Sequence, residues 1–269
     1  MSAVRAVPWT AWGVSDIGFL RERNEDAFAV DGGLGCYLVA DGLGGHRGGE
    51  VASRLARDTV LAALVEAGDG AEAGDAADAG AVLAVAMDAA NSAIRRAAEA
   101  DPALLGMATT VSLLWLPPWD GEGRGWVAHA GDSRVYRLGQ GGLIQLTDDH
   151  NRAGEMVRAG AMTPARAERS LLSHGITRAA GIDPALEADV FALEVADAEA
   201  FLLCSDGLSG MVGHGAIEAA MRDHLGDPRA ACEALVGAAL AAGGRDNVTV
   251  VVVCRDADRA AVVGAPKQA

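Results

Sequence analysis

Apolar and polar residues alternate along this chain in a pattern that predicts blocks of strands separated by pairs of helices. Apolar runs of strand length occur at residues 11–15, 27–30, 36–40, 109–116, 125–130, 134–138, 143–146, 189–195, 200–204 and 248–254. Apolar residues at helical spacing occur at about 49–66, 81–100, 215–224 and 228–242, with shorter helical pieces at 151–159 and 164–170. Because strands follow one another in blocks, the pattern favours antiparallel sheets covered by helix layers over a parallel βαβ fold.

The segment 67–80 is acidic and low in complexity, reading AGDGAEAGDAADAG. It predicts a link between two helices rather than a domain boundary. With 269 residues, the chain has enough length for one or two domains and for a large core. Hydrophobic residues make up 51% of the chain and aromatic residues only 4%, so this core is expected to be mostly Val, Leu and Ala.

Charge and cysteine spacing narrow the range of partners and compartments. The formal net charge is −15 and no basic stripe offsets it, so neither nucleic acid nor an anionic membrane is expected to bind. The first 14 residues do not resemble a signal sequence, and no apolar run approaches the ~18 residues of a membrane span. The cysteines lack C-x-x-C spacing, which predicts buried thiols in a cytoplasmic protein, with neither disulfides nor zinc. They are Cys36, Cys204, Cys232 and Cys254.

A glycine-rich loop, VADGLGGHRGGE at residues 39–50, follows one of the buried strands and leads into a helix. The strand carries Asp41 to its end, and glycines at 42, 44, 45, 48 and 49 allow the backbone to fold tightly beside that carboxylate. Such a loop fits a phosphate held by amides, a cation held by the carboxylate and carbonyls, or a turn without a ligand. It has neither the ending of a P-loop nor the spacing of a dinucleotide fingerprint.

Further aspartates occupy strand ends or tight turns, namely Asp26, Asp132, Asp206 and Asp246. Each could be an ordinary turn residue, but their shared placement indicates that they meet. Two unit charges ~4 Å apart repel by roughly 4 kcal/mol at an effective dielectric of about 20, so such a cluster needs protons or cations. A set of oxygen ligands without cysteine or histidine favours hard ions such as Mg²⁺ or Mn²⁺.

Seven short motifs occur in an order that resembles the metal-dependent protein phosphatases of type 2C, in their short bacterial form. They are RxxNED (21–26), DGLGGH (41–46), ATT (108–110), GDSR (131–134), LTDDH (146–150), SDGL (205–208) and GGxDN (243–247). The resemblance spans residues 13–254. It implies one phosphatase domain over 1–269, with a core at about 10–256, a flap subdomain at 147–180 and a tail at 257–269. The implied fold is α/β (α+β), a four-layer α-β-β-α sandwich of two antiparallel sheets flanked by helix pairs.

The same resemblance implies a centre of two Mn²⁺ or Mg²⁺ ions and a weaker third site. In that centre Asp41 bridges the two ions together with the Gly42 carbonyl, and Asp206 and Asp246 complete the shell of the first. Glu25 and Asp26 hold waters of the second ion, and Asp132 with Asp206 forms the third site. Arg21 would grip the substrate phosphate. His46 is either the acid for the leaving alkoxide or a loop-shaping residue, and His150 is expected to stabilise its turn.

The implied activity is hydrolysis of phosphoserine and phosphothreonine in proteins by a hydroxide that bridges the metals, in a monomer that opposes a bacterial Ser/Thr kinase. A catalytically silent phosphoprotein-binding module of the same fold, or an enzyme acting on another phosphate ester, is the alternative. The flap departs from the family pattern. Ser173-His174-Gly175 stands where Arg-Asn-x is commoner and Asn151 where serine is commoner, which bears on substrate recognition rather than on the chemistry.

Overall fold

Two antiparallel sheets form the centre of the computed structural model, which describes residues 9–43, 48–70, 79–117, 124–167 and 170–256. Among these residues the first sheet has the strand order β1-β12-β11-β8-β9 and the second the order β10-β7-β6-β3-β2. The strands of the first sheet are β1 (Trp9–Asp16), β12 (Val248–Arg255), β11 (Ala200–Cys204), β8 (Arg134–Gly139) and β9 (Gly142–Gln145). Those of the second are β10 (Asp189–Glu194), β7 (Arg124–Ala130), β6 (Val111–Trp115), β3 (Cys36–Ala40) and β2 (Ala27–Asp31). A short pair, β4 (Gly42–Leu43) and β5 (Ala108–Thr109), lies apart from both.

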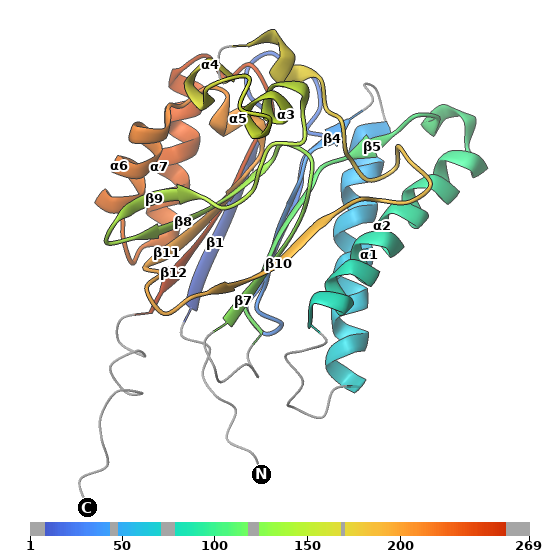
Figure 1. Cartoon of the computed structure of the whole chain (residues 1–269), viewed down its shortest axis with the longest axis horizontal. Helices are drawn as coiled ribbons and strands as arrows, with labels where there is room; N and C mark the ends of the chain where they lie inside the picture. Colours follow the sequence, from blue (N-terminus) through green and yellow to red (C-terminus); the bar gives the residue numbers. More distant parts are fainter. Residues whose placement is uncertain (1–8, 44–47, 71–78, 118–123, 168–169, 257–269) are drawn as a thin grey trace, which may run out of the picture.

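Helices cover the outer faces of the two sheets, giving four layers (Figure 1). The second sheet is covered by α1 (Gly48–Gly70) and α2 (Ala79–Ala100), and the first by α6 (His214–Asp223) and α7 (Pro228–Ala241). Shorter helices gather at one end of the sandwich: α3 (Arg152–Arg158), α4 (Pro164–Ala167) and α5 (Asp206–Ser209). The remaining turns of helix are η1 (Pro102–Leu104) and η2 (Leu171–His174).

Residue alternation along the central strands decides which layer each side chain joins. On β3, Leu38 faces the α1–α2 layer, whereas Tyr37 and Val39 point into the space between the sheets. On β12, Val250 and Val252 pack under α7, and their neighbours face the other sheet. Both faces of these strands are buried, which explains why they read as continuous apolar runs rather than as an alternation. On α1, the buried residues Ala52, Ala56, Val60 and Leu64 recur every fourth position and so form one stripe.

The four-layer architecture and the order of its elements confirm the prediction from sequence, with local differences. Residues 67–70 belong to α1 and residues 79–80 to α2 rather than to a link, and 71–78 lie outside the described residues. The strand expected at 109–116 is divided at Thr110, whose backbone N–H bonds to the Asp41 carbonyl instead of continuing one ladder. All four cysteines are free and buried, as predicted. No helix in the described ranges is long and apolar enough to cross a membrane.

Candidate active site

Strand ends and loops bring the predicted acids together at the end of the sandwich where α3, α4 and α5 gather (Figure 1). All of them except Asp26 line a cavity of about 240 Å³. Its walls come from Arg21, Glu25, Asp41, Gly42, Leu43, Asp132, His174, Ile176, Asp206, Asp246 and Asn247. Segments more than 200 residues apart in the chain therefore meet at one polar cavity, and most of its acidic side chains are those singled out by their positions at strand ends.

Asp41 is held by the two threonines of the Ala-Thr-Thr motif. Its backbone N–H donates to Thr110 Oγ1 at 2.9 Å, and its carbonyl accepts from Thr109 Oγ1 and from the Thr110 N–H, both at 2.9 Å. The Thr110 hydroxyl also bonds with Ser133 Oγ at 2.7 Å, next to Asp132. The motif thus fixes the backbone of one predicted ligand and links it to the turn that carries another.

Glycine is required beside Asp41 because three backbone segments meet there. A Cβ on Gly42 would overlap the Gly49 carbonyl, and one on Gly49 would come within 2.8 Å of the Glu25 carboxylate. The Gly42 N–H donates to the Glu25 carbonyl at 3.2 Å, and Ser53 on α1 donates to the same oxygen at 2.6 Å. The loop is therefore a site of close approach, which accounts for part of its glycine content.

Asn247 ties the loop after β1 to the start of β12. Its Oδ1 accepts from the Glu25 N–H at 2.8 Å, while its Nδ2 donates to the carbonyls of Ile17 and Arg23 at 2.9 and 2.8 Å. The neighbouring Asp246 accepts from Arg21 Nη2 at 2.6 Å. The Asp-Asn motif is evident in the sequence, but its local context gives no role for Asn247, because the partners of Asn247 are more than 200 residues away.

Asp26 lies behind the cavity rather than in its wall. Its Oδ2 accepts from Thr249 Oγ1 at 2.6 Å and from Ser205 Oγ at 2.9 Å, whereas its buried Oδ1 has no hydrogen-bond partner among the described residues. Burial raises the pKa of Asp26 to about 7, despite these two hydroxyl donors. A buried carboxylate oxygen without a partner is the kind of group that a proton, a water or a cation satisfies.

Burial and mutual repulsion dominate the electrostatics of the cavity. Burial, followed by the charges of neighbouring aspartates, raises the pKa of Asp41 well above its ordinary value and raises that of Asp206 as well. The same causes raise the pKa of Asp132 to about 7. Ionisation of all these carboxyls is therefore unfavourable unless protons or cations offset the negative charge.

A family model described as protein phosphatase 2C matches residues 21–240 of the chain. The chain belongs to the protein phosphatase 2C family.

Bacterial phosphatases are among its relatives. The serine/threonine protein phosphatase PstP of Mycobacterium tuberculosis is 38% identical over 242 residues, which cover 88% of this chain and 43% of PstP. The serine/threonine phosphatase stp of Listeria monocytogenes is 32% identical over 248 residues, covering 90% of this chain and 94% of stp. A crystal structure of the catalytic domain of PstP with two manganese ions matches with a TM-score of 0.76 and 36% identity, over 91% of this chain and 97% of that one. The chain thus spans less than half the length of the mycobacterial relative.

The donor set at the site of this protein phosphatase 2C chain fits hard divalent cations. All the acids that line the cavity offer oxygen, and burial and neighbouring charges raise the pKa values of Asp41, Asp132 and Asp206. Among the described residues, Asp26 Oδ1 has no hydrogen-bond partner. In the part of the chain that the structure describes, no three His, Cys, Asp or Glu side chains are grouped closely enough to hold an ion. Asp246 is paired with Arg21 in this structure.

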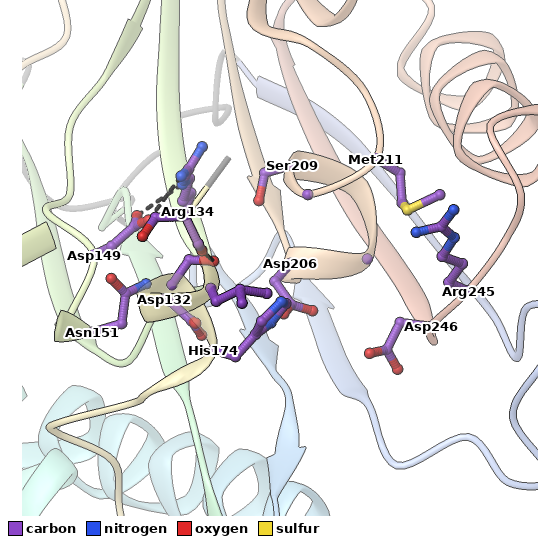
Figure 2. Close-up of a pocket in the computed structure, with 15 residues that line it drawn as sticks. Asp132, Arg134, Asp149, Asn151, His174, Asp206, Ser209, Met211, Arg245 and Asp246 are labelled. Carbon is purple, nitrogen blue, oxygen red and sulfur yellow. Dashed lines mark hydrogen bonds and ion pairs between the residues drawn. The ribbon is translucent and has the colours of Figure 1, made fainter. Parts of the chain in front are cut away.

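A second cavity of about 300 Å³ adjoins the first and is walled in part by the segment predicted to be the flap (Figure 2). Flap residues in its lining are Asp149, Asn151, Ser170, Leu171, Ser173 and His174. The segment predicted to be the flap therefore contributes to the lining of a cavity beside the site. Arg134 grips Asp149 with two bonds of 2.8 and 2.7 Å inside this cavity. His174 lines both cavities, although its sequence context gave no indication of a role.

Of the other histidines in or beside the motifs, His150 and His129 have structural roles. His46, together with Gly44 and Gly45, lies outside the described residues. His150 accepts from the Gly131 N–H at 3.2 Å through Nδ1 and donates from Nε2 to Asp189 at 3.0 Å, so it supports the turn of Asp132 as expected. The buried His129 packs against it, and burial lowers the His129 pKa to about 3, which keeps the ring neutral.

Proposed function

We propose that this chain is a serine/threonine protein phosphatase that hydrolyses phosphoserine and phosphothreonine with Mn²⁺ or Mg²⁺. The observation that carries the proposal is the meeting of five carboxylates and one arginine around a single cavity in a protein phosphatase 2C fold. The manganese-bound structure of the PstP catalytic domain supports the choice of metal. The printed names of the relatives support the choice of substrate class.

Two ions would be held by Asp41 with the Gly42 carbonyl, Asp206 and Asp246, while Glu25 and Asp26 would act through bound water. When bound, the ions supply an activated water nucleophile and positive charge against the phosphoryl oxygens. Hydrogen bonds with Thr109 and Thr110 fix the backbone of Asp41 at the end of β3. No serine or cysteine nucleophile is required, and the four thiols are buried.

Arg21 would bind the substrate phosphate. Its guanidinium lies in the cavity wall, half exposed, and within the described residues its only ion pair is the one from Nη2 to Asp246. Arg21→Ala should therefore raise the KM for a phosphopeptide by about tenfold or more, the usual scale for hydrogen bonds to charged groups. Manganese binding should change little.

Arg23→Ala is the matched control for Arg21. Arg23 is exposed and lies outside the cavity wall, and its backbone carbonyl, which the substitution keeps, accepts a hydrogen bond from Asn247. Steady-state kinetics on one phosphothreonine peptide compare the two variants. A larger loss for Arg23→Ala than for Arg21→Ala would reverse the assignment.

Asp132 would hold a third, weaker ion together with Asp206. It is 7% exposed, lines both cavities and stands on the turn before β8. Asp132→Ala should leave two manganese ions bound in isothermal titration while slowing the hydrolysis of peptides. Unchanged turnover with stability lower by roughly 1 kcal/mol would make Asp132 a turn residue. Loss of tight binding would place it in the main pair.

Release of inorganic phosphate from matched phosphoserine, phosphothreonine and phosphotyrosine peptides tests the function itself. We expect release from the first two in the presence of Mn²⁺ and little from the third. Binding of the peptides without release would instead identify a silent phosphoprotein-binding module. An opposing bacterial Ser/Thr kinase, a monomeric state and a cytoplasmic location remain part of the proposal.

A further inference from the structure

The second cavity is expected to hold the residues on either side of the phosphorylated residue of a substrate. This inference rests on the proposed function. It shares four lining residues with the carboxylate cavity: Asp132, His174, Asp206 and Asp246. A phosphorylated side chain held in the first cavity therefore has its neighbouring residues at or inside the second. The volume of about 300 Å³ is enough for one or two side chains.

Nearly every charge in this second cavity already has a partner or an assigned role. Asp149 is neutralised by Arg134, whose side chain is 15% exposed and bonds to both carboxylate oxygens. Asp132, Asp206 and Asp246 are the proposed metal ligands, so bound ions would offset their charge. Arg134 is therefore held by Asp149 in the cavity wall and is not available to bind a ligand.

Arg245 differs from Arg134 in both exposure and partners. It lines the cavity and is exposed to solvent, and in the described part of the chain its guanidinium has neither an ion pair nor a hydrogen bond. Figure 2 shows it beside Met211, on the other side of the cavity from Arg134 and Asp149. An arginine that faces a cavity without an acid partner is available to bind an anionic group of a ligand.

The turn that carries Arg245 is fixed by the fold. Gly243 and Gly244 have φ values of +127° and +50°, which favour glycine, and their N–H groups bond to the carbonyls of Leu240 and Ala239 at the end of α7. The Gly244 carbonyl in turn accepts from the Phe19 N–H at 2.7 Å. The backbone of Arg245 is thus held at a constant place relative to Asp246, the next residue.

We propose that Arg245 is a specificity-determining residue that selects substrates with an acidic side chain close to the phosphorylated residue. The carboxylate of that side chain would pair with the guanidinium across the second cavity, while the phosphate occupies the first. A basic side chain at the same place would be repelled. The phosphate-binding and metal-binding residues are not involved, so this preference is separable from turnover itself.

A set of phosphothreonine peptides measures the preference. The reference peptide has alanine at the two positions on each side of the phosphothreonine, and its relatives place aspartate or lysine at each of those positions in turn. For at least one position, the wild-type protein should favour aspartate over lysine in kcat/KM by roughly two- to fivefold, the scale of an exposed ion pair. Arg245→Ala should abolish this ratio and Arg245→Glu should invert it.

Arg96→Glu is the matched control, because it makes the same change of charge at an exposed position on α2, over the other sheet. It should keep the wild-type ratio, and hydrolysis of para-nitrophenyl phosphate should be similar in all variants. A ratio that is the same in wild type, Arg245→Ala and Arg245→Glu overturns the inference and leaves the phosphatase proposal standing. If Arg245→Glu does not fold, the comparison of wild type with Arg245→Ala decides. Failure to release phosphate from any peptide overturns the proposed function and this inference with it.

Discussion

Asp41→Asn is expected to reduce metal-dependent turnover by about 100-fold or more, the scale seen when one preorganised electrostatic group is removed from an active site. Asp41 is the residue proposed to contact both ions, and its backbone is fixed by three hydrogen bonds to Thr109 and Thr110. Asparagine keeps the shape of the side chain and those backbone bonds but removes the charge. Steady-state phosphate release, measured beside manganese titration, tests this expectation.

The same substitution should not lower the stability of the metal-free protein at neutral pH. Folding raises the pKa of Asp41, so its ionised form is less stable in the folded state than in the unfolded state. Asparagine lacks that cost, so without metal the variant should unfold at the same temperature as the wild type or at a higher one. Adding Mn²⁺ should raise the unfolding temperature of the variant less than that of the wild type. Asp88→Asn on the exposed face of α2 controls for the change of charge. Near-normal turnover in a folded Asp41→Asn protein would mean that the site is wrongly placed.

Gly207→Ala is expected to lower stability by about 1–3 kcal/mol and to reduce turnover strongly. A Cβ at this position would overlap the carbonyl oxygen of Asn247, which belongs to backbone and has little freedom to move. Relief of the overlap must separate the start of α5 from the start of β12, and these segments carry Asp206 and Asp246. The two effects should therefore appear together in chemical denaturation and in kinetics.

Gly237→Ala provides the control for that substitution. It lies in the interior of α7, where nothing stands within 4 Å of an added Cβ, so it should stabilise the protein by about 0.5–1 kcal/mol. Its turnover should stay at the wild-type level. Equal stability of Gly207→Ala and wild type would show that the two segments are not packed as closely as described.

Local patterns were enough to predict the ends of strands, and the acids of the cavity were found there. Cys36–Ala40 carries both the apolar run and the turn signal that place Asp41, and its predicted bounds match those of β3. Asp206 and Asp246 follow the same logic beside β11 and β12. The four layers could also be predicted, because paired helices between antiparallel strands leave few other ways to bury the apolar faces.

What the sequence could not show depends on contacts between distant segments. The hydroxyls of Ser205 and Thr249, about 180 and 220 residues away, hold Asp26 behind the cavity wall. Arg245 occupied an unspecified position within a motif, and only the turn after α7 shows that it faces a cavity. Such pairings have no local periodicity, so a single sequence carries no signal for them.

The most direct test of the central claim is phosphate release from one phosphothreonine peptide before metal removal, after it, and after manganese is restored. The account predicts that exhaustive chelation abolishes release, because every acid proposed to bind an ion does so through oxygen and needs the ion to offset its charge. Adding Mn²⁺ at a roughly millimolar concentration should then restore the initial rate of phosphate release. Full activity in the chelated protein would contradict the metal-dependent mechanism.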